Sequence, residues 1–83
     1  MKLVVLTPEK EYFNGEVTSV KVPGTSGGFE ILNNHAPIVS SLTAGHIGII
    51  TTQGGNSKLI ITGGFIEAVN NEISILASSV VAE

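Results

Sequence analysis

The chain has 83 residues, enough for one small domain, and a domain of this size buries only about 60% of the surface that its unfolded chain exposes. It contains no cysteine, which excludes a disulfide framework and a thiolate metal site. Its charged residues are four Lys and seven Glu, and the formal net charge is −3. Without any arginine, this balance argues against nucleic acid as a partner, because nucleic acid is bound through Lys and Arg contacts to phosphate.

No segment has the character of a signal peptide or a membrane span. The apolar stretch near the N-terminus stops at Thr7-Pro8, too early for the apolar region of a signal peptide. No apolar run approaches the roughly 20 residues that cross a bilayer, so we expect no direct insertion into a membrane. Charged residues are 13% of the chain, against about 25% in typical soluble domains. Much of the surface is therefore uncharged, and we expect partner proteins to cover part of it.

The elements expected in the first half of the chain are short strands. Val, Ile and Thr dominate the apolar segments and favour strands, whereas Gly, Asn and Pro stand between them and favour turns. Residues 2–7 form the first expected strand, which a proline ends. Residues 11–13 form a short second strand that closes at the hairpin signal Asn14-Gly15. Residues 16–22 form the third.

The second half continues the same pattern. Irregular loops at 23–28 and 33–37 flank an expected strand at 29–32, and the following strands are expected at 38–42, 45–53 (the longest), 57–62, 65–69 and 72–77. The tight turn Asn70-Asn71 joins the last two. About ten short strands at this spacing predict a single all-β domain over residues 1–83, a sandwich of two antiparallel sheets.

Some strands carry apolar residues on both faces. Ile47, Ile49 and Ile50 cannot all point to the same side of a strand, because successive side chains alternate. One face fills the core, and the other needs a covering sheet or partner. The sequence therefore predicts a domain that works by docking onto other proteins.

The two histidines, His35 and His46, suggest a metal or catalytic hypothesis, which the rest of the composition does not support. Zinc needs three or four ligands, and the nearby sequence offers only Glu30. No serine stands in a Gly-x-Ser-x-Gly elbow, and a carboxylate pair such as Glu30 and Glu67 could be drawn from any of seven glutamates. We predict no catalytic residues, no metal and no cofactor.

Residues 24–28, GTSGG, share only their glycines with a phosphate-binding loop. Such a loop opens a helix and ends in Lys followed by Ser or Thr, whereas this segment lies between expected strands and has no lysine. Nucleotide binding is therefore not expected. Lys58 leaves one alternative open, because a lysine beside a hairpin turn is similar to the modified lysine of biotinyl and lipoyl carrier domains. The methionines that flank the biotinyl lysine are absent here.

Three segments together resemble the epsilon subunit of F-type ATP synthases. Residues 27–38, GGFEILNNHAPI, are similar to the family stretch G-x-(hydrophobic)-G-I-L-P-G-H-A-P-L. Residues 63–69, GGFIEAV, are similar to G-G-F-x-E-V, and residues 72–77, EISILA, to a strand close to V-T-V-L-A. The opening segments LVVLTPE and FNGEV also fit, so the resemblance covers nearly the whole chain.

The chain departs from the family pattern at three positions. Glu30 stands where the family usually has Gly, Asn33 replaces Pro, and Asn34 replaces Gly. Asn tolerates the left-handed conformation, so Asn34 is expected to keep the loop geometry. The family normally continues past the position of Glu83 into a C-terminal helical hairpin, and the inhibition and ATP binding attributed to that hairpin are not expected of these residues.

The resemblance implies a sandwich of two five-stranded sheets with no catalytic role of its own. In this family the domain sits in the central stalk, bound to the gamma subunit and the c ring, and it rotates as ion flow is coupled to ATP synthesis. A peripheral position on the cytoplasmic face of a bacterial inner membrane, in a proton-translocating enzyme, follows as an expectation.

The resemblance also assigns contact residues. The expected c-ring contacts are Gly28, Phe29, Glu30, Asn34, His35 and Pro37. We expect Gly63, Gly64 and Phe65 chiefly to allow close backbone approach and to pack in the core, with contact to gamma as a secondary role.

Overall fold

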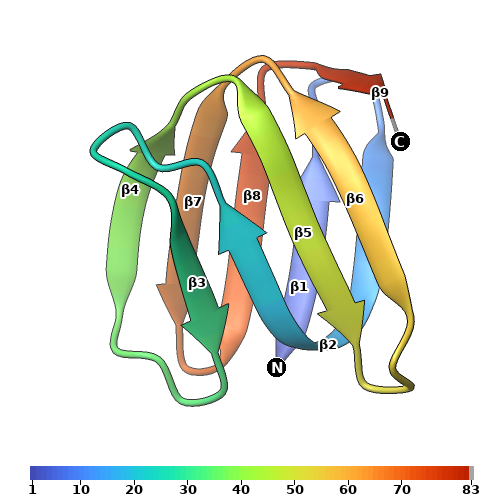
Figure 1. The fold of residues 1–83 in the computed structure, drawn as a ribbon, viewed down its shortest axis with the longest axis vertical. Coiled ribbons are helices and arrows are strands. Elements are labelled where there is room, and N and C mark those ends of the chain that lie inside the picture. The colour runs from blue at the N-terminus through green and yellow to red at the C-terminus, as the bar shows by residue number, and fades with distance from the viewer. Residues whose placement is uncertain (83) are drawn as a thin grey trace.

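Nine β-strands are present in residues 1–82, which are the residues that the computed structural model describes (Figure 1). Their bounds are β1 Lys2–Leu6, β2 Glu11–Val22, β3 Phe29–Leu32, β4 Ile38–Leu42, β5 Gly45–Thr51, β6 Asn56–Ile61, β7 Gly64–Val69, β8 Glu72–Ala77 and β9 Val80–Ala82. The all-β class that the sequence predicts is confirmed. The short strand β9 was not predicted.

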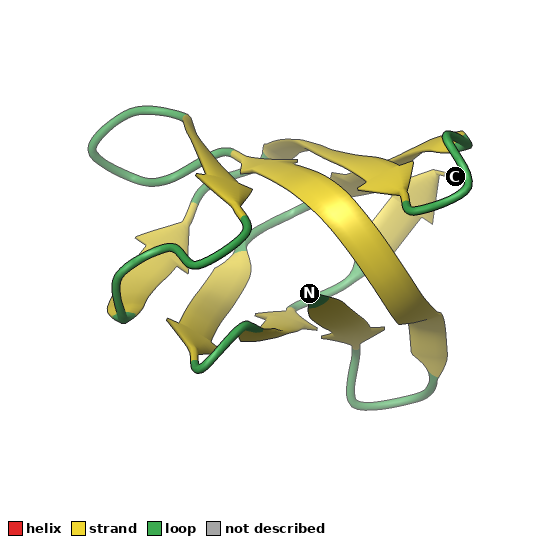
Figure 2. Cartoon of the chain, turned by 90° about the horizontal axis from the view of Figure 1, so that it is seen from below, coloured by secondary structure: helices red, strands yellow, loops and turns green. Residues whose placement is uncertain are grey.

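The strands lie in two layers that share β2, as Figure 2 shows from a second side. The first layer has the order β4-β7-β8-β1-β2, and the second has β3-β2-β5-β6-β9. The first part of β2 pairs with β1 and the last part with β5, and the register shifts between Val17 and Ser19. Each layer therefore contains five strands, as the family resemblance implies.

Aliphatic side chains fill the space between the layers. Buried and exposed side chains alternate along the strands, most clearly in β8, where Ile73, Ile75 and Ala77 are buried and the residues between them are exposed. The large side chains that are less than 2% exposed are Leu3, Val5, Val17, Val20, Ile31, Ile47, Ile49, Ile61, Ile66, Ile73 and Ile75. Burial of one such side chain contributes roughly 1.5–3 kcal/mol. With no disulfide in the chain, this core has to supply most of the stability.

The predicted hairpin at Asn14-Gly15 is wrong. Both residues lie inside β2, opposite Val4 and Leu3 of β1, and neither has the positive φ that a two-residue hairpin turn requires. The chain therefore continues through these residues as a single strand, and β2, with 12 residues, is the longest strand. The strand predicted at 45–53 is shorter than expected, because β5 ends at Thr51.

The strand pairs are antiparallel with one exception. Strand β1 runs parallel to β8, with Lys2 opposite Glu72 and Leu6 opposite Leu76. These two strands come from opposite ends of the chain, so no hairpin imposes an antiparallel arrangement on them. The parallel pair places the first strand in the middle of its layer, between β8 and β2.

Asparagines form the left-handed turns that the sequence predicts. Asn70 and Asn71, with φ of 53° and 62°, make the tight turn between β7 and β8. Asn34 has φ of 64°, which confirms that it keeps the conformation usually given by Gly. Glu30 is a regular β3 residue opposite Lys21, so its replacement of Gly causes no conflict with the backbone.

Gly64 is required by a close approach of β7 to β8. Its φ is 151°, and a Cβ at this position would meet the carbonyl oxygen of Leu76 and lie 2.9 Å from Cα of Ala77. Both neighbours are backbone atoms of β8, which is paired with β7 on one side and β1 on the other, so they cannot easily move aside. The expected role of Gly64 in backbone approach is therefore confirmed.

We predict that Gly64→Ala lowers the free energy of unfolding by about 3 kcal/mol, through the positive φ and the steric overlap together. Gly54→Ala is the matched control, because Gly54 also has a positive φ but has nothing within 4 Å of its would-be Cβ. We expect this control to cost about 1 kcal/mol. Urea denaturation measures both values, and equal losses would show that the close approach to β8 is unimportant.

Candidate docking surfaces

The outer surface of the first layer is unusually apolar. Phe65 of β7 lies opposite Leu76 of β8, and Leu76 lies opposite Leu6 of β1, so the three side chains form a row across three strands. Phe65 is 61% exposed, and Val39 on the edge strand β4 is 73% exposed. Val69 of β7 extends the same surface. We call these five residues the apolar face.

The apolar face holds five of the eight large hydrophobic residues that are exposed in the described part of the chain. Single exposed apolar side chains are normal on the surface of a soluble protein. Several of them gathered on one side of a small domain are typical of a protein–protein contact. Glu67 and Ser74, paired across β7 and β8, lie among these residues. An apolar centre with some polar positions is the usual composition of a docking surface.

Phe65 does not pack in the core as the sequence analysis expected. The alternation along β7 places Ile66 and Ala68 inside, which leaves Phe65 on the outer surface. The two glycines before it, Gly63 and Gly64, contribute backbone only. Of these three predicted residues, Phe65 therefore has the side chain that could touch a partner.

A second candidate surface is the loop between β3 and β4, at residues 33–37. The backbone N–H of Asn34 donates to the Oδ1 of Asn71 at 2.7 Å, and the N–H of His35 donates to the carbonyl of Leu32 at 3.2 Å. The side chains of His35 and Pro37 are exposed. The loop is thus fixed against the β7–β8 turn, and its outer side is available for contact.

Asn33 has a role that the sequence analysis missed. The amino group of Met1 is buried and donates to the Oδ1 of Asn33 and to the carbonyl of Val17, both at 3.1 Å. The same amino group lies 3.6 Å from the Glu16 carboxylate. Asn33 therefore ties the loop to the start of the chain, a contact that no local sequence signal indicates because its partners are distant in sequence.

Gly28 and Phe29 lie away from the Asn34–His35–Pro37 group, at the other end of β3. The four residues of β3 span about 10 Å, and the two loops leave its opposite ends (Figure 1). The Phe29 side chain is half-buried against the core, where Gly24 has no Cβ to obstruct it. The six predicted c-ring residues are therefore distributed over β3 and the loops at its two ends instead of forming one cluster.

Glu30 lies between these two groups, on the outer surface of the second layer. Its carboxylate accepts a hydrogen bond from the hydroxyl of Ser19 on β2 at 2.6 Å. This bond crosses the β2–β3 pair and holds the carboxylate beside Lys21.

The titratable side chains of the described residues do not gather into a metal cluster. Residues 1–82 contain no group of three or more His, Cys, Asp or Glu that could hold an ion. His35 lies on the β3–β4 loop, and His46 is in β5, opposite Ile60 of β6. In the same residues we find no helix with the length and apolar character needed to cross a membrane.

Sequence comparison identifies close relatives. A family model described as the beta-sandwich domain of the ATP synthase delta/epsilon chain matches residues 1–83. An ATP synthase epsilon chain of Chlorobium limicola is 38% identical over 79 residues, which cover 95% of this chain and 90% of the relative. The epsilon chain of Leptospira interrogans is 45% identical over 78 residues, and that of Pelotomaculum thermopropionicum is 37% identical over 78. In the last two, the match spans 59% and 58% of the relative's length.

Structure comparison finds the same fold in larger assemblies. A chain of the Euglena gracilis mitochondrial ATP synthase, in a structure of its OSCP, F1 and c-ring parts, matches with a TM-score of 0.88 at 20% identity. The match covers 96% of this chain and 51% of that one. A chain from the central stalk and c ring of the Tetrahymena thermophila enzyme matches with a TM-score of 0.82 at 21% identity, over 99% and 66% of the two chains. At such identities the likeness concerns the fold alone.

We predict that Asn71→Gly loosens the β3–β4 loop without disturbing the β7–β8 turn. Gly accepts the positive φ of position 71, so the variant removes only the acceptor for the Asn34 N–H. One lost hydrogen bond of this kind should speed amide exchange at Asn34 about fivefold. Asn70→Gly is the control, since it makes the same change in the same turn but leaves that bond intact. Equal exchange rates at Asn34 in both variants would contradict the prediction.

Proposed function

Because the chain belongs to the delta/epsilon family of ATP synthase subunits, we propose that it is a non-catalytic part of the central stalk, joining the gamma subunit to the c ring. In this role it couples ion flow to ATP synthesis by transmitting rotation. The family match carries the proposal, and the apolar face supports it. A stalk component has to hold its shape under torque, and a close-packed core between two hydrogen-bonded layers resists deformation.

The apolar face is the surface that we assign to gamma. Its centre is the row of Phe65, Leu76 and Leu6, which lies on the first layer, away from the β3 edge. A permanent contact inside a rotor should be stable, and apolar burial is the largest favourable term in stable association. The sequence analysis predicted Phe65 as a gamma contact. Because Leu76 and Leu6 lie in the same row across β8 and β1, we include both in the proposed contact.

The β3 edge is the surface that we assign to the c ring. It includes the loop with Asn34, His35 and Pro37 at one end and Gly28 at the other. The approximately 10 Å between its ends fits within one contact, because a typical protein interface buries about 800 Å² on each partner. The polar side chains along this edge suit a partner made of polar loops.

The same assignment places the chain at the periphery of the membrane, as a subunit held there by its partners. The family resemblance supports a position on the cytoplasmic face of a bacterial inner membrane, in a proton-translocating enzyme, as part of this proposal. The alternative of a biotinyl or lipoyl carrier loses support. Lys58 is the third residue of β6, paired with Gly48 inside the sheet, so it is not displayed on the turn itself.

We predict that Leu76→Glu weakens binding to the gamma subunit by roughly tenfold or more, because it places a charge at the centre of the apolar row. Leu32→Glu is the matched control, since Leu32 is 52% exposed and Leu76 53%, but Leu32 lies on the second layer. Calorimetric titration of each variant with purified gamma measures the effect. An unchanged affinity in Leu76→Glu would exclude the apolar face as the gamma site.

We predict that cysteines at positions 28 and 35 both cross-link to the polar loops of the c ring in assembled ATP synthase. Gln53→Cys, in the turn between β5 and β6, is the control and should give no c-ring product. Mass spectrometry of the cross-linked bands identifies the partner. Products from His35→Cys alone would restrict the contact to the β3–β4 loop, and products from neither position would place the c ring elsewhere.

A further inference from the structure

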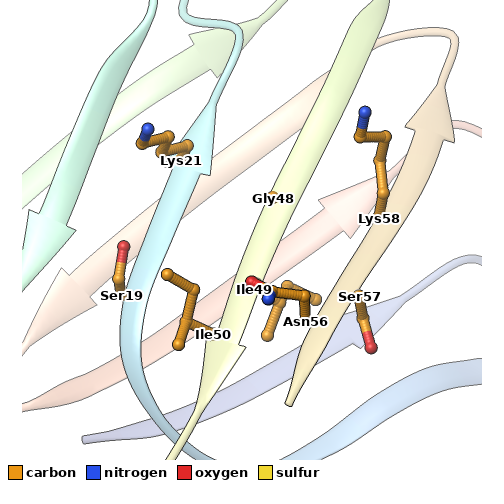
Figure 3. Close-up of a pocket in the computed structure, with 8 residues that line it drawn as sticks. All are labelled: Ser19, Lys21, Gly48, Ile49, Ile50, Asn56, Ser57 and Lys58. Carbon is orange, nitrogen blue, oxygen red and sulfur yellow. The ribbon is translucent and has the colours of Figure 1, made fainter. Parts of the chain in front are cut away.

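The outer surface of the second layer contains a trough centred on Gly48 of β5. Lys21 of β2 and Lys58 of β6 lie directly opposite Gly48, one on each side. The three residues therefore form a row across three strands, with the glycine between the two lysines. Because Gly48 has no side chain, a cavity of about 360 Å³ opens between the two lysines. Figure 3 shows both side chains rising beside it, with Ile50 and Asn56 at its lower end.

The two lysines of the trough have no ion-pair partner among residues 1–82. The one ion pair found in that part of the chain joins the Met1 amino group to Glu16. Lys21 has Glu30 opposite it on β3, with the Glu30 carboxylate hydrogen-bonded to Ser19, whereas Lys58 has no glutamate opposite it on β5. Elsewhere, Lys2 has Glu16 and Glu72 opposite it, and the Lys10 ammonium lies over the ring of Tyr12. The Cα atoms of Lys21 and Lys58 are two strand spacings apart, about 10 Å, which leaves room for one carboxylate between the ammonium groups.

The trough is a cationic site on an acidic chain. Of the glutamates in the described strands, Glu30 is the one whose side chain lies on the second layer, and it borders the trough beside Lys21. Glu16, Glu67 and Glu72 belong to the first layer. With a net charge of −3 on the whole chain, this separation gives the two layers opposite electrostatic character and favours an acidic partner at the second.

The chemistry of the trough suits an acidic peptide better than free phosphate. Strand β5 pairs with β2 on one side and β6 on the other, so its N–H groups are used in the ladders and form no phosphate nest. No arginine is present to make a bidentate phosphate contact. The partly exposed Ile50 adds an apolar contact that a phosphate could not use.

We propose that this trough binds an acidic segment of a protein partner, with a carboxylate held between Lys21 and Lys58 and an adjacent apolar side chain packed on Ile50. The site lies on the layer opposite the apolar face, and it does not depend on the assignments made for gamma and the c ring. It is an interaction surface additional to the apolar face, and it adjoins the β3 edge at Glu30.

An NMR titration of the full chain with the blocked pentapeptide GELEG tests the proposal. We expect shift changes at the amides of β2, β5 and β6 around Lys21, Gly48 and Lys58, and weakening by added salt, because exposed charge pairs are screened. The neutral peptide GQLQG should produce none of these changes. Removing both cations in Lys21→Gln/Lys58→Gln should weaken GELEG binding about fivefold.

Three further variants sharpen the test. Lys2→Gln/Lys10→Gln removes the same charge elsewhere and should leave the affinity within twofold. Gly48→Val should abolish binding by filling the trough, and β5 can hold it because a Cβ there meets only Lys21 Cβ at 3.7 Å. Glu30→Gln should strengthen binding by removing the bordering negative charge.

Several results would overturn the proposal. These are equal binding of GELEG and GQLQG, equal losses in the two double-lysine variants, or shift changes confined to other strands. Phosphate binding at the trough as strong as that of GELEG would make it a simple anion site. Self-association in sedimentation experiments that the Lys21→Gln/Lys58→Gln variant abolishes would assign the trough to a second copy of this chain.

Discussion

The crossing of β2 from one layer to the other holds the two layers of the sandwich together. Val17 lies fully buried at the crossing, and its N–H donates to the carbonyl of Met1 at 2.8 Å while its own carbonyl accepts from the Met1 amino group. The register shift next to it lets one strand bend between two layers, as irregularities do at the corners of sandwiches. Because one continuous strand belongs to both layers, their relative position is fixed by covalent backbone as well as by packing.

This arrangement gives the domain two outer surfaces with different chemistry. In each strand one set of alternating side chains enters the core, so the other set is free to serve a partner. On the first layer that set is apolar around Phe65 and Leu76, and on the second it includes Lys21 and Lys58. The proposed role in a central stalk requires separate surfaces of this kind on a rigid body, and a shared strand supplies both.

The β3–β4 loop shows how a candidate contact surface can be held in place without regular secondary structure. Asn33, Asn34 and Asn71 connect it to the start of the chain and to the β7–β8 turn through side-chain hydrogen bonds. A loop fixed in this way loses less conformational entropy on binding than a free one, so more of its contact energy remains as affinity. His35 and Pro37 are presented on that fixed frame.

The strand content, most of the turns and the family could be predicted from the sequence, because β-branched runs and Asn or Gly turns are local properties of the chain. Glu72–Ala77 and the Asn70-Asn71 turn were predicted as they are found. Four features could not be predicted in this way: Asn14-Gly15 continues a strand, β1 runs parallel to β8, Phe65 faces outward, and Lys21 and Lys58 flank Gly48. The reason is that these features depend on which distant strands pair and in which register, and the free energy that selects the pairing comes from burial across the whole sandwich instead of from any one segment.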